Sequence, residues 1–462
     1  MRQFKLLGVA LGAALLVAAC GGSDDGGSAP APAVKFTGLV SFGDSLSDVG
    51  SYKVGVVAAL GGGTYSVNGI AGAPGASPTP SKNWTELIAA QLSLPAPCPA
   101  QTGLNSAAAL GGAVAVIDYP GCRNYAQGGA RVTDPVGPGS AAAPVNSALG
   151  QLTMPIVTQI ATHLARVGGS FGGTELVTVM AGGNDALRVL DKLTADATAA
   201  GTTAFGNALV SGLVALVPNP ANQPAAAAAI GSALQTAAAA GASTTSIVTA
   251  AVTAASGQPG VTLPINPTAI VAAASTAAAS AGASYAKTTG GPAAVLAMAQ
   301  AGKELASYIK TQIVGKGAKY VAVVNLPDLS STPSATSQSA DTQGLILNMV
   351  IYFNTMLESE LAGTPGVRLV DTFSDVRNQV ANPASYGLSN VTTPACNLNA
   401  PANGLADPAK PESGTSLVCN ASNLKAGDTS RYLFADSVHP TPYGYKLLAD
   451  LVNKSLVQAG WV

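Results

Sequence analysis

The sequence predicts an α/β protein in which helices cover both faces of a parallel sheet. Two observations carry this prediction: short apolar runs bounded by turn residues, and helical stretches that separate these runs along the chain. The runs lie near residues 36–42, 176–181, 320–325 and 367–371, and a further strand is expected around 114–117. Because consecutive parallel strands need a crossover between them, the alternation favours a parallel sheet with helices on both faces.

The first of these strands runs directly into a candidate nucleophile. Gly43 and Asp44 form a turn ahead of Ser45, at the carboxyl end of the strand, where open α/β sheets place reactive groups. A serine hydroxyl must hand its proton to a neighbouring base as it attacks, and histidine has the ordinary pKa that suits this role. The chain contains only two histidines, so the candidate bases are few.

His439 is the candidate base. Asp436 stands three residues before it, close enough for its carboxylate to orient the imidazole and to stabilise the protonated ring. His163 lies in a stretch with apolar residues at helical spacing and has no carboxylate within four residues, so we expect it to be structural.

Four short blocks along the chain carry a family resemblance. They are residues 43–46 (Gly-Asp-Ser-Leu), 124–130 (Asn-Tyr-Ala-Gln-Gly-Gly-Ala), 182–185 (Gly-Gly-Asn-Asp) and 436–440 (Asp-Ser-Val-His-Pro). In this order they resemble the signatures of the GDSL, or SGNH, hydrolases, and especially the long branch with plant GDSL lipases and bacterial lecithinase and hemolysin-like esterases. The resemblance covers about residues 36–190 and 290–460. Some bacterial relatives in this branch carry a C-terminal membrane barrel, which we do not expect in this chain.

The resemblance implies a fold and a set of residue roles. The fold is a flavodoxin-like three-layer α/β/α sandwich. The catalytic triad would be Ser45, His439 and Asp436. A tetrahedral oxyanion needs preorganised donors, and the family pattern supplies the Ser45 N–H, a glycine N–H and the Asn184 side-chain amide. The glycine is Gly129, with Gly128 as the one-position alternative.

The N-terminal segment predicts export. Residues 1–19 combine a basic start, an apolar run and small residues, as in a secretory signal peptide. Small residues directly before Cys20 resemble a bacterial lipoprotein signal, which implies lipid attachment to Cys20; an ordinary signal peptide cut nearby is the alternative. Residues 20–34 have the composition of a flexible tether, ahead of a hydrolase domain at 35–462. The expected location is the outer membrane, through this anchor, or the extracellular space.

Four further cysteines, Cys98, Cys122, Cys396 and Cys419, lie in loop-like segments. An even set in an exported protein favours disulfides. Three pairings are possible, and the local one, which joins Cys98 to Cys122 and Cys396 to Cys419, closes two loops of similar length. No Cys or His spacing suggests zinc, and neither a metal nor an organic cofactor is expected.

Composition argues against two classes of protein. The formal net charge is −1 and no basic patch stands out, so nucleic-acid binding lacks its electrostatic basis. Beyond the leader, no apolar run approaches the roughly 20 residues needed to span a bilayer. The membrane is therefore expected as a partner only through the lipid on Cys20.

An alanine-rich insertion is expected at 195–288. No charged residue occurs between Asp196 and Lys287. Helices are expected at 206–217 and 230–255, with proline breaks at 218–220 and 264–267. Because the insertion follows the third block, its root should lie near the active-site mouth. It is either a helical cap that receives acyl chains or a hydrophobic polymer, or packing that only enlarges the scaffold.

Together these features predict a serine carboxylic ester hydrolase, an esterase or lipase that works through an acyl-enzyme. Phospholipase, acyltransferase and polyester depolymerase activities at the same site are the alternatives. The uncharged insertion favours an apolar acyl ester, and an aromatic content of 5% argues against a sugar substrate. A surface-binding lipoprotein on a retired hydrolase scaffold is the non-enzyme alternative, although such proteins usually lose a triad member.

Overall fold

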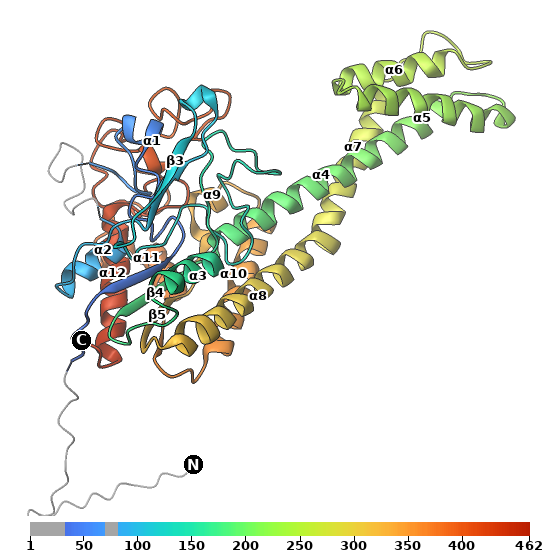
Figure 1. The fold of residues 1–462 in the computed structure, drawn as a ribbon. Coiled ribbons are helices and arrows are strands. Elements are labelled where there is room, and N and C mark those ends of the chain that lie inside the picture. The colour runs from blue at the N-terminus through green and yellow to red at the C-terminus, as the bar shows by residue number, and fades with distance from the viewer. Residues whose placement is uncertain (1–32, 70–81) are drawn as a thin grey trace, which may run out of the picture.

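A four-stranded parallel sheet forms the centre of the protein (Figure 1). The computed structural model describes residues 33–69 and 82–462, so the expected leader at 1–19, Cys20 and most of the tether at 20–34 lie outside the described residues. Across the sheet the strands are β1 (Leu39–Gly43), β4 (Leu176–Met180), β5 (Tyr320–Val324) and β6 (Val367–Val370). All three neighbouring pairs are parallel. The predicted α/β class and the four predicted strands are therefore confirmed.

The strand expected around 114–117 forms, but its expected place in the parallel sheet is wrong. β3 (Val114–Asp118) pairs antiparallel with β2 (Gln101–Leu104) in a separate two-stranded sheet. Residues 115–118 are exposed on both faces of β3, whereas a strand in a parallel sheet is buried on both faces. Residues 123–127 run along the free edge of β1 instead, where the Tyr125 N–H donates to the Ser41 carbonyl at 2.8 Å.

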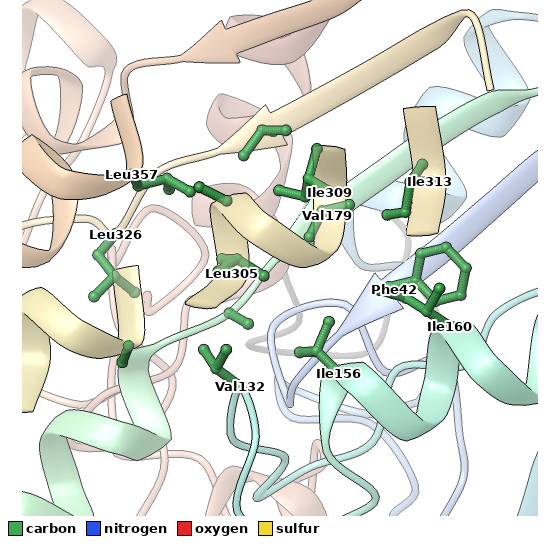
Figure 2. Packing of buried hydrophobic residues seen from close by; sticks show 14 of the residues in the cluster. Phe42, Val132, Ile156, Ile160, Val179, Leu305, Ile309, Ile313, Leu326 and Leu357 are labelled. Carbon is green, nitrogen blue, oxygen red and sulfur yellow. The ribbon is translucent and has the colours of Figure 1, made fainter. Parts of the chain in front are cut away.

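Helices bury both faces of the sheet. One face is covered by α3 (Ile156–Arg166), α8 (Gly291–Tyr308) and α10 (Ala340–Leu361), and the other by α2 (Trp84–Gln91) and α12 (Pro442–Gln458). Figure 2 shows Phe42 and Val179 packed in the first of these cores. Leu176 and Met180, from the same strand as Val179, enter the other core. Successive side chains of a strand point to opposite faces, so the architecture has three layers.

Local sequence determines where several helices begin. The Asn83 side chain accepts hydrogen bonds from the backbone of Thr85 and Glu86, and the Glu86 carboxylate accepts from the Asn83 N–H, which makes a capping box at the start of α2. Thr441 caps α12 in a similar way, with proline at the first helical position. The shorter helices of the body are α1 (Gly55–Ala59), α9 (Pro333–Thr336) and α11 (Thr372–Ala381).

The alanine-rich insertion forms an arm that projects from the body (Figure 1). Its helices are α4 (Gly183–Val214), α5 (Gln223–Ala239), α6 (Thr244–Ser256) and α7 (Thr268–Tyr285). α4 and α7 lie side by side along the arm, and α5 and α6 lie at its far end. Small residues allow the close approach: a Cβ on Gly201 would lie 3.0 Å from the Ala278 carbonyl oxygen.

Two of the expected helix boundaries in the arm are wrong, and the proline breaks are confirmed. The helix expected to begin at 206 is the distal part of α4, which starts at Gly183 and runs for 32 residues without a proline. The stretch 230–255 is two helices separated by a turn, in which Gly241 adopts a φ of +70°. Prolines end α4 and precede α7 as expected.

The expectation about membrane-spanning length also needs correction. Within the described residues, one helical stretch, Thr268–Lys316, is long and apolar enough by length and composition to cross a membrane. Its mean hydropathy comes largely from alanine rather than from a run of large apolar residues, so the stretch does not stand out in the sequence as a membrane span. The stretch comprises α7, α8 and the short helical turns beside them, and only 6% of its most apolar window is buried.

Candidate active site

Ser45 follows the carboxyl end of β1, on a turn that is fixed by hydrogen bonds to its backbone. The Gln159 side chain on α3 bonds both backbone groups of Gly43: it accepts from the N–H at 2.9 Å and donates to the carbonyl at 2.8 Å. The Asp44 carboxylate accepts from the Leu46 N–H at 3.0 Å. These bonds direct Ser45, which is 8% exposed, into a pocket at the edge of the sheet.

The structure brings Ser45, His439 and Asp436 into one hydrogen-bonded chain. Ser45 Oγ lies 2.8 Å from His439 Nε2, and His439 Nδ1 lies 2.8 Å from Asp436 Oδ2. With its proton on Nδ1, the imidazole keeps Nε2 free to accept the serine proton. Residues almost four hundred positions apart in sequence therefore have the geometry of a nucleophile, a base and an orienting carboxylate.

The Asp436 carboxylate is buried and extensively hydrogen-bonded. Its oxygens accept from the backbone N–H groups of Val438 (2.9 Å), His439 (2.8 Å) and Ser416 (2.7 Å). Burial alone would raise the pKa of this carboxyl, but the neighbouring His439 and the hydrogen bonds from Ser416 and Val438 hold the pKa below its ordinary value. Asp436 is thus kept as an anion beside the imidazole.

Three donors face the same pocket as Ser45. Gly129 has a φ of +80°, and a Cβ there would lie 2.2 Å from the Pro138 carbonyl oxygen, so the position requires glycine. Within the described residues, the N–H groups of Ser45 and Gly129 have no acceptor in the protein. Asn184 Nδ2 donates to the Ala130 carbonyl at 2.8 Å, which orients the amide and leaves its second hydrogen available.

Gly128 and Gly129 differ in whether the backbone N–H already has an acceptor, and the difference comes from Asp48, a residue without a predicted role. The Gly128 N–H donates to Asp48 Oδ2 at 3.0 Å, so it is already used. The other oxygen of Asp48 accepts from Gly50 and Ser51 at 2.9 and 2.8 Å. Burial raises the pKa of Asp48 to about 6 although these three bonds oppose the rise. Asp48 therefore joins the loop that carries Ser45 to the segment with Gly128 and Gly129, a contact that no local signal in the sequence predicts.

Tyr65 is a second residue that sequence reasoning missed. Its ring centroid lies 4.8 Å from that of His439, and its hydroxyl is hydrogen-bonded to the Gln151 side chain. Both residues line the pocket around Ser45. The ring packs beside the imidazole and restricts its movement, and nothing in the residues next to Tyr65 indicates this long-range contact.

Two other aspartates of the signature blocks hold loops. Asp185 accepts from the Val132 N–H at 3.0 Å and from Arg131 Nε at 3.2 Å, which joins the third block to the residues that follow the second. Burial raises the pKa of Asp185 to about 6 against the effect of Arg131. Burial likewise raises the pKa of Asp44 to about 7, although the Leu46 N–H opposes the rise.

His163 lies away from this pocket, in the core beneath the sheet. Its ring packs against Phe42, Tyr125 and Phe171, and Nδ1 lies 3.2 Å from the Tyr125 hydroxyl. Burial lowers the pKa of His163 to about 4. The residue therefore has a packing role, as its sequence context predicts.

The four cysteines of the body form the local pairs, Cys98–Cys122 and Cys396–Cys419. The second pair lies close to Asp436. The Cys396 N–H donates to the carbonyl of Ala435, the residue before Asp436, at 2.9 Å. Ser416, whose N–H holds the Asp436 carboxylate, is three residues before Cys419. This disulfide thus joins two segments that position Asp436.

The pocket itself has a volume of about 280 Å³ and mainly apolar walls. Its aliphatic lining consists of Leu46, Leu149, Leu187, Leu190, Leu329, Ile346 and Val438. Within the described residues, none from 195–288 contributes to this lining. The first two turns of α4 therefore form part of the pocket wall, and the rest of the arm extends beyond it. In the described part of the chain, no cluster of three His, Cys, Asp or Glu residues able to hold a metal ion occurs.

Two comparisons with known proteins bear on this site. Residues 284–452 match the model of a family described as GDSL-like lipase/acylhydrolase, and this range contains Asp436 and His439. The chain is also 29% identical over 154 residues to the anther-specific proline-rich protein APG of Arabidopsis thaliana, an alignment that covers 32% of this chain and 26% of that protein. The chain thus spans about a quarter of the length of this curated relative.

Proposed function

We propose that the chain is a hydrolase of ester bonds of the kind described as GDSL-like lipase/acylhydrolase, whose family model matches residues 284–452, and that Ser45, His439 and Asp436 are its catalytic triad. The observation that carries this proposal is the 2.8 Å separation of Ser45 Oγ and His439 Nε2, with the Asp436 carboxylate on the opposite ring nitrogen. The proposed substrate is an ester of an apolar acyl group, because aliphatic side chains surround Ser45.

In the proposed reaction, Ser45 Oγ attacks the ester carbonyl carbon while its proton passes to His439 Nε2. The carbonyl electron pair moves to oxygen, and the oxyanion accepts hydrogen bonds from the Ser45 N–H, the Gly129 N–H and the Asn184 amide. The intermediate expels the alcohol, which takes the proton from His439, and leaves an acyl group on Ser45. Water then gives its proton to His439 and attacks the acyl carbon, which releases the acid and restores Ser45.

The test compares Ser45→Ala with a matched variant from the same loop, Ser47→Ala. The hydroxyl of Ser47 is buried and has no hydrogen-bond partner within the described residues. We expect Ser45→Ala to lose at least about a thousandfold in kcat on p-nitrophenyl butyrate, and Ser47→Ala to remain near wild type. A fluorophosphonate should label wild type and Ser47→Ala only. Wild-type-like turnover by folded Ser45→Ala would refute the assignment of the nucleophile, and unlabelled wild type would favour the retired-scaffold alternative.

The alcohol part of the substrate distinguishes the remaining alternatives. A phospholipase, an acyltransferase and a polyester depolymerase would share the same acyl-enzyme and differ in what leaves and what attacks. The pocket lining favours an apolar acyl group and does not select among these alcohols. Purified enzyme assayed on p-nitrophenyl esters, phosphatidylcholine and an aliphatic polyester, with an added alcohol as competing acceptor, would rank them.

Export and lipid attachment at Cys20 are part of the proposal and rest on the sequence of residues 1–20. The two disulfides support an oxidising compartment. In a bacterial host, palmitate should label the wild-type chain, and Cys20→Ser should abolish the label and release the protein from the membrane fraction. Equal labelling of both proteins would contradict lipid attachment at Cys20.

A further inference from the structure

A second, larger hollow lies at the base of the arm. It is a groove of about 1,370 Å³ bordered by α4, α7, α8 and α10 and, towards the tip, by the facing ends of α5 and α6. α4 lines it from residue 190 to residue 206, about 24 Å at the rise of an α-helix. The groove is thus elongated and follows α4 and α7, the two long helices of the arm.

The side chains that line this groove are mostly small and weakly polar. Alanine, glycine, leucine and valine alternate with threonine, and no charged residue lines the groove between Asp196 and Lys287. The hydroxyls of Thr194, Thr198 and Thr202 each donate to the carbonyl four residues earlier in α4, at 2.8 to 2.9 Å. Because these donors are used within the helix, the side chains offer mainly methyl groups to a ligand.

The groove adjoins the pocket around Ser45. Leu190 lines both hollows. On α10, Leu345 lines the groove and the next residue, Ile346, lines the pocket. A chain that enters the pocket from Ser45 therefore meets the groove at Leu190 without crossing a charged side chain. The two charged residues that line the groove, Lys287 and Asp341, are exposed, and neither of them lines the pocket.

We propose that the groove binds the distal methylenes of a long acyl chain whose ester carbonyl lies at Ser45. This inference rests on the proposed function and extends it: the 280 Å³ pocket takes the proximal part of the acyl group, and the arm takes the rest. Burial of one methylene contributes roughly 0.8 kcal/mol, or about fourfold in kcat/KM. The arm would thus make the enzyme selective for long-chain esters.

The test places a tryptophan in the groove and, as a control, elsewhere on the same helix. Ala279 of α7 lines the groove, and Ala273 of α7 is exposed outside it. We expect Ala279→Trp to lower kcat/KM for p-nitrophenyl palmitate about tenfold or more, the equivalent of two lost methylene contacts, and to change that for p-nitrophenyl butyrate less than twofold. Ala273→Trp should leave both values near wild type. Thr198→Trp, on the opposite wall, gives a second variant should Ala279→Trp fail to fold.

A binding measurement separates the groove from catalysis. In the Ser45→Ala background, parinaric acid should bind and be displaced by hexadecanoate but not by butyrate, and Ala279→Trp should weaken its binding about tenfold. An unchanged palmitate-to-butyrate ratio in folded Ala279→Trp and Thr198→Trp would overturn the inference while leaving the proposed function intact. Absence of butyrate hydrolysis by the wild type would instead refute the proposed function. An equal loss in Ala273→Trp would show a general effect on the arm and would also overturn the inference.

Discussion

Replacement of Asp48 by asparagine tests whether this carboxylate holds the proposed oxyanion donor in place. Asn is the same size as Asp but has only one acceptor oxygen. It can keep the bonds from Gly50 and Ser51 and must then turn its NH2 group toward the Gly128 N–H. Two donors would face each other, and the lost bond to a charged group is worth about 1.5–3 kcal/mol. The strain falls on the peptide next to the Gly129 N–H.

The effect on catalysis follows from that displacement. Complete loss of one oxyanion donor costs roughly 10²- to 10³-fold in kcat. Because Asp48→Asn should displace the Gly129 N–H donor rather than remove it, we expect kcat to fall about 10- to 100-fold. This fall corresponds to a loss of about 1.4–2.7 kcal/mol of transition-state stabilisation. The value of KM should change little, since the donor acts mainly on the charge that develops in the transition state.

The assay is steady-state hydrolysis of p-nitrophenyl butyrate, with folding checked by circular dichroism. Asp191→Asn is the matched control, because Asp191 pairs with Arg188 on the surface of α4 and its side chain is 63% exposed. That variant should retain wild-type kcat. A folded Asp48→Asn enzyme with kcat within twofold of wild type would refute the reasoning, and a rise in KM alone would show that Asp48 shapes the substrate site instead.

Three further outcomes are expected. Replacing Cys396 and Cys419 by serine should lower the thermal midpoint, in line with about 2–5 kcal/mol for a lost disulfide. The same variant should lose more kcat than serine replacement of Cys98 and Cys122, because the Cys396–Cys419 disulfide joins segments that hold the Asp436 carboxylate. Equal losses of kcat in the two variants would contradict this. The raised pKa of Asp44, about 7, means that the folded state binds its proton more tightly than the unfolded chain, so this group lowers stability as pH rises from about 4 to about 7. Asp44→Asn should therefore gain thermal stability over wild type as the pH is raised from 4.5 to 8, and parallel melting curves across this range would argue against burial of a titrating carboxyl. Gly302→Ala should lower the free energy of unfolding by about 1–3 kcal/mol, because the added Cβ would lie 2.4 Å from a backbone oxygen of α10. Gly231→Ala, whose Cβ would meet nothing within 4 Å, should leave that free energy unchanged or raise it by up to about 1 kcal/mol in chemical denaturation. The opposite order would refute the close packing of α8 on α10.

The sheet strands were predictable because each is a short apolar run whose side chains enter two cores. The segment that lies along the edge of the sheet, beside β1, was not predictable in the same way. Whether residues 114–118 or 123–127 lie beside β1 depends on which backbone can approach it, and both stretches have strand-like features. In the arm, helix propensity predicted helices but placed their limits poorly, because a propensity averaged over alanine-rich sequence does not mark a start at Gly183 or a turn at Gly241.

The sequence by itself determined the chemical groups of the candidate site and their local settings: a serine after a buried strand, and a histidine three residues beyond an aspartate. Both depend on neighbours within a few positions, which is the range over which pattern and turn chemistry act. Only the tertiary structure decided that Gly129 rather than Gly128 has a free N–H, that Asp48 holds that segment, and that a groove along the arm adjoins the pocket at Leu190. These features arise where segments distant in sequence meet, and their hydrogen bonds and shape exist only once the chain is packed.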